Sequence, residues 1–163
     1  MTVRDALERE SAIFGSEKSL ARAELLQIES LIFIENGEPD QAEISIRESL
    51  AIFAKIRGNN AYLPYAQSIK ILADVLLCKK KVEEAKDVMV SSLNMFKILI
   101  KDSPTFEFGE AFVLMGKILL LLGDFEKLHS TYKELETRFG KDNENTKKLF
   151  SIITKANKAW IIG

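Results

Sequence analysis

The side chains with the greatest chemical potential in this sequence are its one cysteine and its one histidine. Cys78 is followed by lysines at positions 79–81, and neighbouring cations lower a thiol pKa. His129 lies far from Cys78 in the sequence, so neither a catalytic Cys–His pair nor a metal-binding His pair is indicated. We therefore expect Cys78 to be a buried helix residue and His129 to be a partly exposed surface residue, and we expect the protein to bind no metal.

Carboxylates and phosphate-binding loops give no catalytic pattern either. Glu83 with Glu84, and Glu134 with Glu136, are i,i+1 and i,i+2 neighbours, which point to different sides of a helix. The glycines at 58 and 140 lack the G-x-x-x-x-G-K-[ST] pattern of a phosphate loop. The lysines at 79–81 suit a helix C-terminus, where positive charge complements the helix dipole. We predict that the chain is not an enzyme and binds no cofactor.

The composition indicates one globular domain without a dominant surface charge. The 163 residues are 47% hydrophobic, and 23 basic side chains nearly balance 24 acidic ones. This balance gives no general attraction to nucleic acid or to an anionic membrane. The longest apolar run, residues 118–122, is far shorter than the roughly 20 residues of a membrane span. With its charged N-terminus and single cysteine, the chain is predicted to be cytoplasmic, without nucleic acid or membrane as partner.

An internal repeat organises the sequence. Three turn-like segments end at Ala42, Ala85 and Leu128, which are 43 positions apart, and a phenylalanine follows eleven residues after each, at 53, 96 and 139. A small residue stands twelve positions before each of Ala42, Ala85 and Leu128, within an apolar stretch of helical period. These small residues are Ser30, Ala73 and Gly116. The pattern predicts pairs of helices that pack closely through small side chains.

Eight helices are predicted, at roughly 3–14, 18–36, 39–57, 63–80, 82–101, 105–122, 124–139 and 143–160. Pro39, Pro64 and Pro104 fall near helix starts, where a missing N–H is tolerated. Ser103 and Asp124 are expected to be N-caps. The predicted organisation is a single domain, 1–163. It divides into a half repeat (1–16), three units (17–58, 59–103, 104–140) and a C-terminal capping helix (141–163) with Leu149 on its apolar side.

These features resemble the tetratricopeptide repeat family. The resemblance covers roughly residues 23–139, and its best unit runs from Gly109 to Gly140, with Gly123-Asp124-Phe125-Glu126 at the turn between the two helices. The 43-residue spacing is longer than the usual repeat of about 34 residues and is similar to the longer class found in kinesin light chains. The resemblance implies an all-α, right-handed superhelical α-solenoid of antiparallel helix pairs.

The resemblance also implies a concave face, formed by the first helix of each pair, that binds a peptide or an amphipathic helix of another protein. The residues mapped onto this face are Gln27, Leu31, Ile34, Glu35, Lys70, Asp74, Leu77, Val113, Lys117, Leu120 and Leu121. Chaperone-binding members grip a carboxylate here with basic and amide side chains. Gln27, Leu31 and Glu110 occupy the matching places, so no such clamp is predicted.

Two interpretations stay open for the apolar members of this set, Leu31, Ile34, Leu77, Leu120 and Leu121. They form either a groove for an apolar ligand or part of the packed core. The leading functional hypothesis is an interaction scaffold or adaptor. The alternative is a structural solenoid segment of a larger protein, or one that self-associates through Phe14 and the Trp160-Ile161-Ile162 tail. A regulatory domain of an enzyme would look the same as the first.

Overall fold

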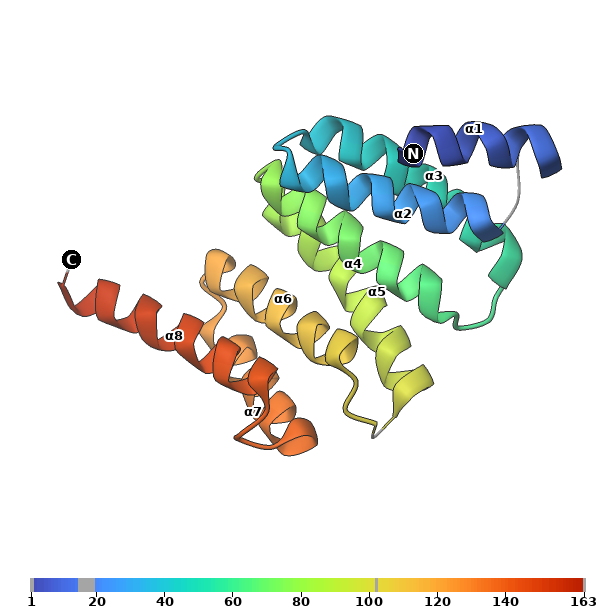
Figure 1. Cartoon of the computed structure of the whole chain (residues 1–163). Helices are drawn as coiled ribbons and strands as arrows, with labels where there is room; N and C mark the ends of the chain where they lie inside the picture. The colour runs from blue at the N-terminus through green and yellow to red at the C-terminus, as the bar shows by residue number, and fades with distance from the viewer. Residues whose placement is uncertain (1, 15–19, 102, 163) are drawn as a thin grey trace.

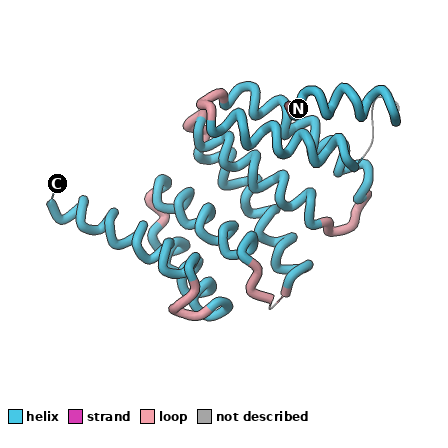
Figure 2. Tube along the Cα trace, viewed as in Figure 1, coloured by secondary structure: helices cyan, strands magenta, loops and turns pink. Residues whose placement is uncertain are grey.

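The computed structural model describes residues 2–14, 20–101 and 103–162, and the side chains of these residues except those of 10, 11, 13, 14 and 159–162. The described part contains eight helices and no strand. They are α1 (Val3–Phe14), α2 (Leu20–Glu35), α3 (Pro39–Arg57), α4 (Leu63–Cys78), α5 (Val82–Ile100), α6 (Phe106–Leu122), α7 (Phe125–Phe139) and α8 (Glu144–Ile162). Short loops join α2 to α5 and α6 to α8 in turn (Figure 2).

The helix ends follow from local sequence. Pro39 and Pro64 stand in the first turns of α3 and α4, where a missing N–H leaves no hydrogen bond unmade. Asp124 caps α7 as predicted, with its side chain accepting a hydrogen bond of 3.2 Å from the Lys127 amide. The prediction of Ser103 as the α6 cap was wrong. Thr105, after the proline, has the extended backbone that a cap needs, and its hydroxyl accepts from the Phe108 amide at 3.4 Å.

The helices form a solenoid, which confirms the predicted all-α architecture. Helices α2, α4, α6 and α8 follow one another in a row and run in the same direction (Figure 1). Helices α3, α5 and α7 form a second layer, and each packs against the row helices that precede and follow it. We call α2, α4, α6 and α8 the row helices and their shared surface away from the second layer the inner face.

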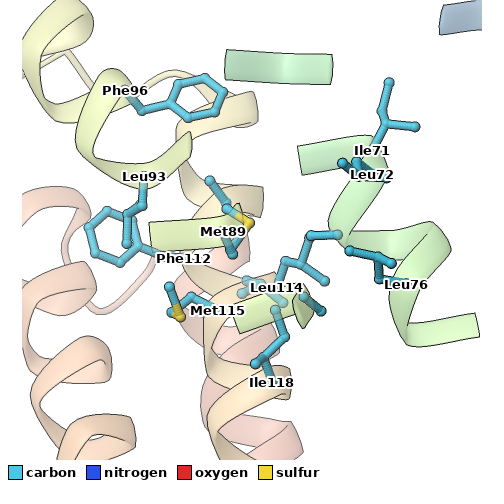
Figure 3. Close-up of a cluster of buried hydrophobic side chains, with 14 of the residues drawn as sticks. Ile71, Leu72, Leu76, Met89, Leu93, Phe96, Phe112, Leu114, Met115 and Ile118 are labelled. Carbon is cyan, nitrogen blue, oxygen red and sulfur yellow. The ribbon is translucent and has the colours of Figure 1, made fainter. Parts of the chain in front are cut away.

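One large apolar cluster runs through the pairs α4–α5 and α6–α7, and it includes Phe96, Phe108 and Phe112, all at most 1% exposed. Figure 3 shows Met89, Leu93 and Phe96 of α5 meeting side chains of α6 such as Phe112. Complete burial of each such side chain stabilises the fold by about 1.5–3 kcal/mol. A smaller cluster lies at the N-terminal end, where Leu7 packs with Phe53.

Serine hydroxyls hold two of the pairs together from within. Ser49 of α3 donates to the Ala23 carbonyl oxygen of α2 at 2.8 Å, and Ser92 of α5 donates to the Ala66 carbonyl oxygen of α4 at 2.7 Å. All four residues are fully buried, and the small alanines let the helices approach closely enough for these bonds. The equivalent position in α7 is Leu135, so the pair α6–α7 relies on apolar packing at this point.

Two glycines bring α8 against α6. A Cβ atom at Gly109 would lie 2.9 Å from Asn145 Cγ, and one at Gly116 would lie 3.1 Å from Leu149 Cδ2, both inside van der Waals contact. Asn145 and Leu149 are buried in this contact, whereas Lys147, Lys155 and Lys158 of α8 are exposed. Helix α8 therefore completes the row with an apolar side toward α6 and a basic side toward solvent.

Candidate protein-binding surface

The inner face begins at α2, where the structure assigns Gln27 a bridging position. Its side-chain amide donates to the Pro64 carbonyl oxygen at 2.9 Å and to the Ser68 hydroxyl at 2.6 Å. Both acceptors belong to α4, and Gln27 is half-buried. Because its donors are used within the fold, Gln27 ties α2 to α4 and has little capacity left to bind a partner.

The apolar residues mapped to this face divide into two groups. Ile34, Leu77 and Leu120 are partly buried and pack against the large core cluster, and Val113 is only 3% exposed. Leu31 and Leu121 are different, because 45% and 65% of their surfaces are exposed. Val113 was predicted to be a surface residue and is instead buried, because α6 is covered on one side by α4 and on another by α8.

A cluster of charged side chains occupies the middle of the inner face. Lys70 of α4 and Glu110 of α6 form an ion pair of 3.0 Å, which links neighbouring row helices. Asp74 lies one turn further along α4 and is half-buried. Burial raises the pKa of the Asp74 carboxyl above its usual 3.8, although the ammonium groups of Lys70 and Lys117 oppose this change. Asp74 is thus a carboxyl that is only partly compensated by its neighbours.

Lysines from two helices surround this cluster. Lys117 of α6 and Lys148 of α8 are exposed, and within the described part of the chain neither ammonium forms an ion pair. They border a cavity of about 80 Å³ that is lined by Lys70, Asp74, Glu110, Val113, Leu114, Lys117 and Lys148. The sequence reasoning missed Lys148. Lys148 belongs to a basic stripe on the last helix. This helix is not part of the 43-residue repeat, so the repeat does not predict where the helix lies in the row.

The remaining predicted residues lie at the ends of the row helices. Glu35, the last residue of α2, is exposed, and so is Cys78, the last residue of α4. The expectation of a buried cysteine was wrong, because Cys78 takes the position in its row helix that Glu35 and Leu121 take in theirs, and all three are exposed. His129 is exposed, as expected.

A second, more apolar groove of about 570 Å³ lies between α7 and α8. Phe125 and Phe150 on its walls are 49% and 56% exposed, and the Tyr132 and Phe150 rings are 5.9 Å apart. The residues that line it are Phe125, Leu128, His129, Tyr132, Lys133, Glu136, Phe150, Ile153 and Asn157. His129 thus stands at the rim of an apolar groove, without a second histidine or a cysteine.

The described residues contain no group of three or more His, Cys, Asp or Glu side chains placed to hold a metal ion. None of the described helices is both long enough and apolar enough to cross a membrane.

Known structures share this arrangement of helices. The structure of BtubC (BKLC) from P. vanneervenii superposes with a TM-score of 0.78 over 96% of this chain and 64% of that one, at 16% identity. The TPR domain of Arabidopsis FLU superposes with a TM-score of 0.63 over 74% of this chain and 97% of that one, at 21% identity. This chain has a tetratricopeptide-like repeat fold.

The predicted tetratricopeptide resemblance is therefore confirmed at the level of the fold. The chain spans 64% of BtubC, less than two thirds of that protein. No protein-family model and no curated protein matches the sequence. At these identities the likeness concerns shape, so the binding chemistry of this tetratricopeptide-like chain has to be argued from its own side chains.

Proposed function

We propose that this chain is a protein-interaction scaffold whose inner face binds a segment of a partner protein. The proposal rests mainly on one observation: exposed leucines stand on α2 and α6 of the inner face, and two exposed lysines without ion-pair partners among the described residues stand on α6 and α8. The leucines are Leu31 and Leu121, and the lysines are Lys117 and Lys148. Exposed aliphatic groups beside unpaired cations are typical of a surface that is covered when a partner binds.

The partner segment should be an extended peptide or an amphipathic helix with aliphatic and acidic side chains. An aliphatic residue of the partner would cover Leu31 or Leu121, and a carboxylate would pair with Lys117 and Lys148. Lys70 is already paired with Glu110, and Gln27 is bound to α4, so neither is assigned to the partner. Leu77 and Leu120 contribute to the stability of the face and not to its contact surface.

A peptide selection tests this proposal. A phage-displayed library of random 16-residue peptides is panned on the wild-type chain, and enriched peptides are titrated by fluorescence anisotropy against wild type and variants. We expect aliphatic and acidic residues to be enriched. We expect Leu31→Ser to weaken binding about tenfold and Lys117→Glu more, because it replaces an attraction by a repulsion. The Lys117→Glu effect should shrink as salt is raised from 50 to 500 mM, on the screening lengths expected there.

Ile44→Ser supplies the control, because Ile44 is 62% exposed on α3, away from the row helices. This variant should bind the selected peptides like wild type. Peptides that bind all variants equally, or a selection with no preference for acidic residues, would refute the assignment of the inner face.

The alternative of a self-associating or purely structural segment rests on Phe14 and Trp160-Ile161-Ile162, whose side chains lie outside the described residues. It stays a prediction, as do the absence of enzymatic activity, of a cofactor and of nucleic-acid or membrane partners. We also propose a cytoplasmic location, on the strength of the single cysteine.

A further inference from the structure

Two apolar positions recur in the row helices at the 43-residue spacing. In α4 they are Ile71 and Val75, which are 7% and 0% exposed, and in α6 they are Leu114 and Ile118, which are 6% and 0% exposed. In α2 the same positions hold Ile28 and Ile32, and these are 48% and 41% exposed. All six residues are thus aliphatic, but only the four in α4 and α6 are buried, and the two in α2 are exposed.

The difference comes from what precedes each row helix. Ile71 and Val75 belong to the buried cluster that also contains Ala42 and Ile46 of α3, so the preceding pair covers them. The helix before α2 in the described structure is α1, which has 12 residues where α3 has 19. The cluster around Leu7 of α1 contains Ala23 and Leu26 in the first half of α2, whereas Ile28 and Ile32 are largely exposed.

In Figure 1, α1 lies along the N-terminal part of α2, and α3 lies along α2 toward its C-terminal end. We call the exposed surface around Ile28 and Ile32 the N-terminal edge. It has the aliphatic character of a helix-packing surface, and in both later units that surface is covered by helices.

We propose that the N-terminal edge, which adjoins Leu31 of the inner face on α2, is a second docking site that binds an amphipathic helix of a partner with an aliphatic stripe and basic flanks. The helix would pack against Ile28 and Ile32 in the way that the preceding pair packs against Ile71 and Val75. Its apolar stripe follows from the residues it covers, and its charge follows from the acidic side chains beside them.

Those acidic side chains are Glu24 and Glu35, which are exposed on the same side of α2, one before Ile28 and one after Ile32. Among the described side chains neither of them forms an ion pair or hydrogen bond. The surrounding segment is acidic as well, since residues 1–58 contain 11 Asp and Glu against 7 Lys and Arg. Lysine or arginine at the margins of the incoming helix would pair with Glu24 and Glu35.

The same charges argue against a second copy of this chain. Two N-terminal edges facing each other would bring Glu24 and Glu35 against their own copies. The other end of the solenoid is a poor match too, because among the described side chains of α8 those on the side away from α6 are Lys147, Ser151, Thr154 and Lys158, which form no aliphatic stripe. A separate basic amphipathic helix is therefore the occupant that fits.

Two synthetic peptides test this inference. Both are 18-residue fluorescein-labelled helices with the same leucine and alanine stripe, and one has lysine flanks where the other has glutamate flanks. Fluorescence anisotropy measures their binding to the full chain. We expect the lysine peptide to bind wild type, the glutamate peptide to bind at least about tenfold more weakly, and Ile28→Ser/Ile32→Ser to lose about tenfold in affinity for the lysine peptide.

The matched control is Ile44→Ser/Ile98→Ser, which removes two exposed isoleucines, 62% and 64% exposed, from the second layer. It makes the same chemical change elsewhere and should bind the lysine peptide like wild type. Hydrogen exchange on the wild-type complex supplies a readout that needs no variant, with protection expected at residues 28–35.

Four results would overturn the inference: no binding of the lysine peptide, equal binding by the edge variant, equal binding of both peptides, or protection outside α2. A dimer in sedimentation velocity that Ile28→Ser/Ile32→Ser abolishes would also overturn it, in favour of a second copy as the occupant. The inner-face proposal is separated from this one through Lys117, which stands on α6 and not on α2, so either proposal can fail without the other.

Discussion

Replacing Gly109 with alanine should loosen α8 from α6, because the two helices meet through this glycine. The new Cβ atom would lie 2.9 Å from Asn145 Cγ and 3.0 Å from Asn145 Cβ. The second of these atoms is fixed to the backbone of α8, so a change of side-chain rotamer alone cannot relieve the contact. Helix α8 has to move away, and the 3.3 Å hydrogen bond from Asn145 Nδ2 to the Phe106 carbonyl oxygen is strained or lost.

The expected magnitude combines opposing effects. Overpacking costs about 1–3 kcal/mol, and the lost hydrogen bond of a buried amide costs about 1 kcal/mol more. Against this, alanine in a helix interior is better than glycine by about 1 kcal/mol. The net loss should be about 1–3 kcal/mol, which lowers Tm by roughly 2–10 °C for a chain of this length.

Circular dichroism melting measures the loss, and hydrogen exchange shows whether it is concentrated in residues 144–158. Asn145→Ala removes the clashing Cγ, so the double variant Gly109→Ala/Asn145→Ala should lose less than the sum of the two single losses. Lys117→Ala, an exposed change on the same helix, should stay within about 0.5 kcal/mol of wild type. If Gly109→Ala is as stable as wild type and α8 keeps its protection, the close α6–α8 contact is refuted.

Three further variants test other parts of the structure. Phe96→Ala should cost about 3–5 kcal/mol in urea denaturation because Phe96 is fully buried, whereas Phe106→Ala, at a 54% exposed position, should cost far less; similar losses would contradict the assigned core. Gly123→Ala should lower stability by about 1–2 kcal/mol in thermal melts. Gly123 follows α6 with φ +69° and has open space around it, so the cost comes from backbone strain alone. An unchanged Tm would contradict this turn conformation. Asp74→Asn should be more stable than wild type at pH 7, because burial raises the folded-state pKa of the Asp74 carboxyl and its ionised form therefore opposes folding. The stability advantage of the variant should shrink as pH falls through that raised pKa toward 3.8, because the wild-type carboxyl then becomes protonated. An advantage that is absent at pH 7, or that grows in acid when urea midpoints are compared, would contradict the assigned environment of Asp74.

Most of the fold could be predicted because small and aromatic residues recur at a fixed spacing and mark the repeat. Ala42, Ala85 and Leu128 are nearly or fully buried, and every helix bound lies within two residues of its predicted place. The exceptions are local. Proline at 104 led to the prediction of Ser103 as the α6 cap, but the helix starts after Thr105, whose hydroxyl accepts from the Phe108 amide.

The binding surface was less predictable, because exposure depends on neighbouring helices and not on residue type. Leu120 and Leu121 are adjacent leucines on α6, yet one packs against the core and the other is 65% exposed. Helical spacing shows that two adjacent residues point in different directions. Which of them is buried can be predicted only when the position of every neighbouring helix is known. Val113 was misplaced for the same reason, and Lys148 was missed because the position of α8 depends on the glycines of α6.

The buried serines give the solenoid an uneven stiffness along its length. Separating α2 from α3, or α4 from α5, would break the hydrogen bond from the hydroxyl of Ser49 or Ser92, at a cost of about 1–3 kcal/mol for each hydroxyl that stays buried without a partner. The pair α6–α7 has Leu135 at this position and carries no such resistance. Under bending or tension, α6 and α7 should shift first, so the curvature of the inner face is most adjustable at the end that carries Lys117 and Lys148.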